Sequence, residues 1–222
     1  MTVSSESERL RRSWIANASA WSAAVRERRI ESRRVVTDAA IVAAILEQNP
    51  RSVLDVGCGE GWLARSLSSH GIAVTGIDSS VPLIEAAQAL GGGDFRAVSY
   101  EELIASPALA GTDFDVVVAN FSILDDRAEE LFRALSSKCL IVQTIHPRFA
   151  GEGAYADGWR TETFDAMPGE WPESMPWYFR TIESWHRLFT AAGYRVAEIR
   201  EPMYPDRAVP ASMIFICHPE AA

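Results

Sequence analysis

The stretch that decides the fold is Arg51-Ser52-Val53-Leu54-Asp55-Val56-Gly57-Cys58-Gly59-Glu60-Gly61-Trp62-Leu63. It predicts a buried strand that carries an acid, then a glycine turn and the start of a helix. The next apolar run ends at a second acid, Asp78, seventeen residues after Gly61. A glycine turn lets a ligand approach bare backbone, and an acid ending the following strand can hold a ribose. The pair indicates a site for a nucleoside-bearing cofactor.

Around this stretch, apolar runs alternate with helical patterns. The runs are continuous rather than alternating, as expected when helices cover both faces of a sheet. No helix fits between the last two runs, so we expect these two strands to pair antiparallel. The prediction is an α/β fold: a doubly wound, seven-stranded, mostly parallel sheet with an antiparallel last strand. The expected strands are 52–56, 73–78, 94–98, 114–119, 139–144, 194–200 and 212–217.

Two segments lie outside this alternation. Apolar residues at helical spacing predict an N-terminal helical cap over residues 1–50, and residues 1–7 are expected to be disordered. Residues 146–183 form a long insert after the fifth strand, rich in aromatic residues and proline. A long irregular insert in a compact domain is usually functional, so we expect a substrate lid. Nothing splits the chain, and residues 1–222 are expected to form one domain.

The bulk composition narrows the partners. A net charge of −9 argues against a nucleic-acid surface, which needs clustered cations. Cys58, Cys139 and Cys217 are odd in number and widely spaced, which is typical of reduced core residues in a cytoplasmic protein. We see no metal-ligand spacing, no signal peptide and no apolar run long enough for a bilayer. The expectation is a monomer or homodimer with no metal, nucleic-acid or membrane partner.

The glycine turn distinguishes between cofactors. Dinucleotide sites use G-x-G-x-x-G, whereas this turn reads G-x-G-x-G, and Asp55 adds a negative charge that repels a pyrophosphate. Residues 53–61 resemble motif I of class I S-adenosylmethionine-dependent methyltransferases. Residues 76–80 and 115–121 are similar to that family's motifs at the second and fourth strands. The resemblance covers roughly residues 30–217, and it is closest to the small-molecule branch of the ubiquinone/menaquinone-biosynthesis type.

The resemblance implies S-adenosyl-L-methionine as the methyl donor, with S-adenosyl-L-homocysteine as its product. The glycines would let backbone pack against the cofactor, Asp78 would accept both ribose hydroxyls, and Asp55 would reach the ammonium group, directly or through water. Related enzymes place an upstream arginine on the cofactor's carboxylate. Arg33 and Arg34 both fit, and we favour Arg33 because it lies nearer the apolar helix face. The expected cofactor contacts are Arg33, Asp55, Gly57, Gly59, Asp78, Ser79, Ser99, Tyr100, Asn120 and Phe121.

Methyl transfer needs alignment of the nucleophile, and a base only when that nucleophile is protonated. His146 follows the fifth strand at the carboxyl edge of the sheet and is the expected general base. The alternative is a His-Pro turn residue with no chemical role. The aromatic residues of the insert either contact substrate or only pack the insert onto the sheet. The expected substrate contacts are Trp14, Trp21, Trp159, Trp177, Tyr178 and Arg180.

The functional expectation is methyl transfer to a small-molecule acceptor of unspecified identity, through oxygen, nitrogen, carbon or sulfur. A nicotinamide dehydrogenase is disfavoured by the glycine spacing and by Asp55. A non-catalytic, cofactor-binding regulatory or partner protein on the same scaffold stays open, because an intact cofactor motif says nothing about catalysis.

Overall fold

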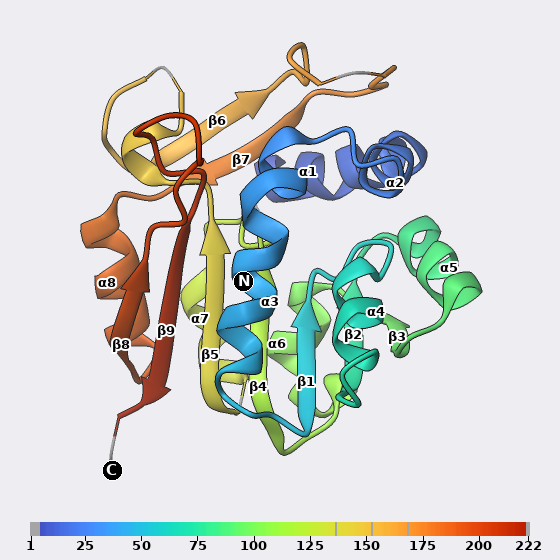
Figure 1. The fold of residues 1–222 in the computed structure, drawn as a ribbon, viewed down its shortest axis with the longest axis vertical. Helices are drawn as coiled ribbons and strands as arrows, with labels where there is room; N and C mark the ends of the chain where they lie inside the picture. Colours follow the sequence, from blue (N-terminus) through green and yellow to red (C-terminus); the bar gives the residue numbers. More distant parts are fainter. Residues whose placement is uncertain (1–4, 136, 152, 168, 221–222) are drawn as a thin grey trace.

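The computed structural model describes residues 5–135, 137–151, 153–167 and 169–220. Its main sheet has seven strands in the order β3-β2-β1-β4-β5-β9-β8, with helices on both faces (Figure 1). β9 pairs antiparallel with both of its neighbours, β5 and β8, and the other neighbouring strands of this sheet pair parallel. The expected doubly wound α/β fold is therefore confirmed. The strands are β1 (Ser52–Val56), β2 (Ala73–Asp78), β3 (Asp94–Ala97), β4 (Phe114–Asn120), β5 (Ser137–Thr144), β8 (Tyr194–Arg200) and β9 (Met213–Pro219).

The core has two layers, one on each face of the sheet. Successive side chains of β4 alternate between them: Val117 packs with one layer, and Val116 and Val118 pack with the other. A central strand buried on both faces has no polar side, which is why the sequence shows continuous apolar runs. Helices α6 (Tyr100–Ala105), α7 (Ala128–Ala134) and α8 (Ile182–Ala191) cover one face, and α3 (Asp38–Leu46), α4 (Trp62–Ser68) and α5 (Val81–Leu90) cover the other.

The N-terminal helices are α1 (Ser5–Ala16), α2 (Ala18–Arg26) and the π-helical turn η1 (Arg33–Thr37), which leads into α3. Residues 1–4 lie outside the described residues. The expected disorder is wrong for residues 5–7, because they begin α1. Two ion pairs, Glu6–Arg9 and Glu8–Arg11, each join side chains one helical turn apart and stabilise this first part of the helix. Leu10 then packs into a third apolar cluster.

The insert after β5 is more regular than expected. It contains the short turn η3 (Pro147–Phe149) and an antiparallel hairpin of β6 (Gly158–Glu162) and β7 (Met175–Phe179). The hairpin lies across the carboxyl end of the main sheet, beside α1 (Figure 1). Apolar residues from the hairpin, its loop and α1 together form the third cluster. The expectation of an irregular segment is wrong, because glycine and proline near the strand ends hide the pairing pattern.

Two smaller features complete the fold. A short 3₁₀ turn, η2 (Pro107–Ala110), precedes β4. Cys58, Cys139 and Cys217 are buried free thiols, as expected. Within the part of the chain that the structure describes, no helix has the length and apolar character needed to cross a bilayer.

Candidate active site

A cavity of about 900 Å³ lies at the carboxyl ends of the central strands. Gly57 lines it after β1, Asp78 at the end of β2 and Asn120 at the end of β4. Trp14 of α1 and Trp177 of β7 line it from the helical cap and the hairpin. Open α/β sheets bind ligands at this edge, where the strand order reverses. The reversal here falls between β1 and β4.

The glycine turn has a backbone conformation that requires glycine and a hydrogen bond to the end of β2. Gly57, Gly59 and Gly61 have φ values of +75°, +56° and +81°, a left-handed conformation that favours glycine. A Cβ on Gly57 would lie 2.3 Å from the Cβ of Ser122, so a side chain there does not fit. The Gly59 amide donates to Asp78 Oδ2 over 3.0 Å, which joins the turn to the end of β2.

Two carboxyl groups lie next to this turn: Asp78 is half-buried and lines the cavity, whereas Asp55 is buried and does not line it. Asp78 accepts from the amides of Gly59 (3.0 Å) and Ser80 (2.8 Å), and each carboxylate oxygen keeps capacity for another donor. Asp55 is 1% exposed, and its Oδ1 has no hydrogen-bond partner within the described residues. Burial and the neighbouring Asp78 charge raise the pKa of Asp55 to about 7. Burial also raises the pKa of Asp78. Such a pair suits a ligand that brings hydroxyl donors and a cation.

Arg33 approaches the cavity from the π-helical turn. It is 9% exposed, its Nε donates to Asp38 Oδ1 over 2.9 Å, and its guanidinium carbon lies 4.6 Å from the ring centroid of Trp62. Its Nη2 is buried without a partner among the described residues. Arg34 is exposed and does not line the cavity. The structure thus distinguishes between the two arginines that the sequence left open.

The ends of β3 and β4 supply the next part of the lining. Asn120 Oδ1 is buried and has no partner within the described chain. Phe121 adopts a left-handed φ of +54°, and its amide donates to Gln143 O over 2.8 Å. Tyr100 donates its hydroxyl to Ser122 O over 2.8 Å, and burial raises the pKa of this phenol. Ser79, Ser99, Tyr100, Asn120 and Phe121 all line the cavity.

Ser99 has a second role that the sequence reasoning did not assign. Its hydroxyl accepts from the Glu102 amide, and the Glu102 carboxylate accepts from the Ser99 amide. This capping box starts α6. Ser99 therefore contributes to helix stability as well as to the cavity wall.

Aromatic side chains cover the cavity on the side of the cap and the hairpin. Trp14 and Trp21 meet edge to face, with ring centroids 5.2 Å apart. Of the expected substrate residues, five line the cavity: Trp14, Trp21, Trp177, Tyr178 and Arg180. Trp159 does not. It pairs with Tyr178 across the hairpin and packs into the third apolar cluster.

The structure places His146, the expected general base, outside the cavity. The side chain is 2% exposed and does not line the cavity. Its Nε2 lies 2.7 Å from Glu201 Oε1, and its Nδ1 accepts from the Arg148 amide over 3.2 Å. Both ring nitrogens are engaged outside the cavity, so His146 begins the η3 turn and pins it to the segment after β8.

Sequence reasoning missed several lining residues, among them Trp62, Asp125 and Tyr204. Trp62 directly follows the last glycine of the turn, and that position was a usable signal. Asp125 and Tyr204 lie in loops without a recognisable motif. Only the folded chain brings them to this edge.

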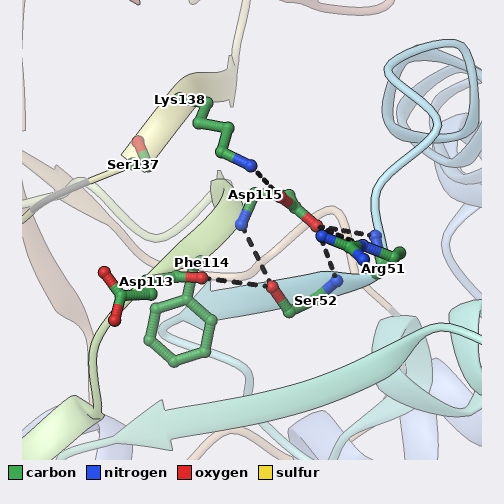
Figure 2. A pocket seen from close by; sticks show the side chains of 7 residues that line it. All are labelled: Arg51, Ser52, Asp113, Phe114, Asp115, Ser137 and Lys138. Carbon is green, nitrogen blue, oxygen red and sulfur yellow. Dashed lines mark hydrogen bonds and ion pairs between the residues drawn. The ribbon is translucent and has the colours of Figure 1, made fainter.

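A second hollow of about 590 Å³ lies at the opposite, amino edge of the sheet (Figure 2). Asp115 points toward Lys138 and Arg51 there. Its carboxylate accepts from Lys138 Nζ at 2.7 Å and from the amides of Arg51 and Ser52 at 2.9 and 3.3 Å. These contacts fasten the starts of β1, β4 and β5 together. We assign this hollow a structural role.

Residues 53–139 match the family model described as a methyltransferase domain. The match spans the glycine turn, Asp78 and the end of β4, which are the parts that build the cavity. This part of the chain is therefore similar to a methyltransferase domain. Solved structures of the same fold include methyltransferases with S-adenosylhomocysteine bound.

Known proteins similar to this chain differ in their sequence identity to it and in the length over which they match. An uncharacterised methyltransferase of Schizosaccharomyces pombe is 26% identical over 175 residues, which are 74% of this chain and 67% of that protein. A ubiquinone biosynthesis O-methyltransferase of Coxiella burnetii is 53% identical, but only over 38 residues, 17% of this chain and 16% of that protein. The chain thus spans a small part of this second relative.

Among solved structures, the Burkholderia thailandensis 1,6-didemethyltoxoflavin-N1-methyltransferase, with 1,6-didemethyltoxoflavin and S-adenosylhomocysteine bound, has a TM-score of 0.65. The comparison covers 100% of this chain and 93% of that one, at 17% identity. At such identity the likeness shows the fold alone.

Proposed function

We propose that this methyltransferase domain transfers a methyl group from S-adenosylmethionine to a small-molecule acceptor. The observation that carries the proposal is the set of buried, unpartnered polar atoms around the glycine turn: Arg33 Nη2, Asp55 Oδ1 and Asn120 Oδ1. Burying polar atoms without partners is costly, and functional sites are where such atoms are retained. A zwitterionic, hydroxyl-bearing ligand in the cavity satisfies Arg33 and Asn120, which line it, and reaches Asp55 through water.

Each group fits one part of the cofactor. The Arg33 guanidinium binds the carboxylate, and Asp55 binds the ammonium group through water. Asp78 accepts the ribose hydroxyls while the Gly59 and Ser80 amides hold its carboxylate in place. Ser79, Ser99, Tyr100, Asn120 and Phe121 complete the proposed contacts with the nucleoside and with the region of the transferred methyl, and Gly57 and Gly59 give the ligand access to backbone.

Bound S-adenosylmethionine supplies an electrophilic methyl group for in-line displacement. The chain excludes water and orients the acceptor. The aromatic wall of Trp14, Trp21, Trp177 and Tyr178 encloses the space beyond the cofactor residues. A cavity of about 900 Å³ has the size range of small-ligand sites, which favours a small acceptor over a protein segment.

The 38-residue match to a ubiquinone biosynthesis O-methyltransferase supports placing the domain in the ubiquinone/menaquinone-biosynthesis branch. We further propose a cytoplasmic location, a single domain with a helical cap and an aromatic insert, and a monomeric or homodimeric state. The alternative is a non-catalytic cofactor-binding protein. The position of His146 outside the cavity favours this alternative.

Two measurements test the proposal in sequence. Calorimetric titration with S-adenosylhomocysteine is expected to show saturable, micromolar binding, and its absence refutes the cofactor assignment. A screen of small phenol, amine and carboxylate acceptors with methyl-labelled cofactor is then expected to give a labelled product. Tight cofactor binding with no product from any acceptor class supports the non-catalytic alternative.

A further inference from the structure

Arg180 is a buried cation with unused donors. It follows β7 directly, is 4% exposed and lines the cavity. Its Nη2 donates to the backbone oxygen of Asp125, while its Nη1 is buried without a hydrogen-bond partner in the described chain. A guanidinium carries five donors in a rigid fork, so this side chain keeps capacity for another acceptor.

The protein does not neutralise this cation through a direct ion pair within the described residues. The contrast is Arg127, whose Nη2 lies 2.6 Å from Glu130 Oε2. The nearby Asp125 carboxylate instead accepts from the Arg127 amide over 2.9 Å. Burying a charge without a partner is costly, and such a charge is retained where a ligand pairs with it.

Aromatic rings surround the guanidinium. Its central carbon lies 4.7 Å from the ring centroid of Tyr178 and 5.3 Å from that of Trp185. Tyr178, Trp185 and Trp177 also line the cavity. A planar apolar body packs well against such a wall, while its acidic group meets the cation.

We propose that the methyl acceptor is a planar aromatic acid whose carboxylate pairs with Arg180. This inference rests on the proposed methyltransferase function, because it names the acceptor class of the same cavity. The carboxylate takes the free edge of the guanidinium at Nη1, and the ring lies against the hairpin aromatics. Arg180 thereby selects anionic acceptors over neutral ones of the same shape.

Matched acid and amide pairs test the preference in the native protein. The probes are 4-hydroxybenzoate against 4-hydroxybenzamide, and indole-3-acetate against indole-3-acetamide, titrated calorimetrically in the presence of saturating S-adenosylhomocysteine. We expect each acid to bind at least about tenfold more tightly than its amide, the size of a charge-assisted hydrogen bond. Equal affinities within both pairs, or no binding of either acid at millimolar concentration, overturn the inference.

Variants test whether the Arg180 side chain causes the preference for acids over amides. Arg180→Gln is expected to abolish the difference between acid and amide, and Arg180→Lys to retain part of it. Arg160→Gln is the matched control. Arg160 lies in the same hairpin, with its guanidinium carbon 3.5 Å from the ring centroid of Phe179, and does not line the cavity. It is expected to keep the full preference, and a preference that survives Arg180→Gln contradicts the assignment.

The measured affinity for S-adenosylhomocysteine distinguishes a failure of this inference from a failure of the proposed function. Retained S-adenosylhomocysteine affinity shows that a variant is folded, which matters because Arg180 also holds the Asp125 carbonyl. If Arg180→Gln does not fold, the comparison of acid and amide in the native protein still decides the inference. Native protein that binds S-adenosylhomocysteine but shows no acid preference refutes only the acceptor class. Native protein that does not bind it refutes the proposed function itself.

Discussion

Single buried residues set the electrostatics of the cofactor site. Asp55 lies in β1, is 1% exposed and has an unpartnered Oδ1 within the described residues. Its pKa is raised to about 7 by burial first and by the Asp78 charge second. Arg33 is a buried guanidinium that pairs with Asp38 through Nε and keeps an unpartnered Nη2 within the described residues. A zwitterionic ligand supplies a carboxylate for this Nη2 and a cation for the acidic side of the site.

Asp55 makes the stability of the free protein depend on pH. Its folded pKa of about 7 exceeds the ordinary value of 3.8 for an aspartate side chain. The folded state therefore binds the proton more tightly, and the contribution to stability falls as pH rises from about 4 to about 7. The full change is at most on the order of 4 kcal/mol, since one pKa unit corresponds to about 1.4 kcal/mol.

Asp55→Asn removes this dependence because the amide does not titrate. Urea unfolding across about pH 5 to 8 is expected to show native stability declining relative to the variant. Asp115→Asn is the control, since Lys138 and two backbone amides lower the pKa of Asp115 to about 2. Parallel pH profiles for native protein and Asp55→Asn contradict the assignment.

Arg33 and Arg34 give a matched pair at adjacent positions. Arg33→Ala is expected to weaken S-adenosylhomocysteine binding by about tenfold or more, because it removes a charge-assisted hydrogen bond to the ligand carboxylate. Arg34→Ala is expected to leave the affinity unchanged, because this side chain is exposed and away from the cavity. Calorimetry on both variants decides, and equal losses count against the carboxylate role.

At the scale of elements, the hairpin and the first two helices act as one unit. Asn17, between α1 and α2, donates to Glu173 O over 2.7 Å and accepts from the Glu173 amide over 3.2 Å. The asparagine is 1% exposed, and its amide also donates to Ser13 Oγ. This two-bond clamp fixes the loop between β6 and β7 against the helical cap, which closes the aromatic side of the cavity.

Asn17→Ala is expected to loosen the hairpin. Two backbone groups of Glu173 lose their partner, at a cost of about 0.5–1.5 kcal/mol for each hydrogen bond, because Glu173 is exposed to water. Hydrogen exchange of the β6 and β7 amides is expected to accelerate, while exchange in β4 and β5 stays unchanged. Gln88→Ala is the control, because it also breaks a hydrogen bond from a side chain to a backbone oxygen, that of Phe95 in β3, away from the hairpin. Uniform acceleration over the sheet contradicts a local clamp.

At the scale of the whole molecule, three parts meet at one edge. The sheet supplies the glycine turn and Asp78, the helical cap supplies Arg33 and two tryptophans, and the end of the hairpin supplies Arg180. The net charge of −9 accompanies a buried site that holds both cations and acids. Ligand binding at such a junction stabilises the arrangement of all three parts.

S-adenosylhomocysteine is therefore expected to raise the melting temperature. At a hundredfold excess over Kd the stabilisation is about 2.7 kcal/mol, which corresponds to roughly 5–10 °C for a domain of this size. Asp78→Asn is expected to reduce the shift, because it removes a carboxylate from the proposed ribose contact. Differential scanning calorimetry measures both proteins, and identical shifts contradict the role of Asp78.

The sequence predicts those elements whose local residue pattern marks their ends. Strands β2 and β8 match their expected bounds, because continuous apolar runs end at a glycine, an acid or a loop. The hairpin was missed because β6 and β7 pair through Trp159 and Tyr178 without a polar–apolar alternation that marks strands. His146 was misassigned because its position after β5 suggested the cavity, whereas Glu201 and the Arg148 amide hold its ring elsewhere.

The sequence by itself determined the sheet, the glycine turn and the acid after β2, because strand periodicity and left-handed glycines are local properties of the chain. Only the tertiary structure decided which of Arg33 and Arg34 faces the cavity, that His146 does not, and that Arg180 is a buried cation with unused donors. The physical reason is that burial and pairing depend on neighbours distant in sequence, such as Trp62 for Arg33 and Asp125 for Arg180.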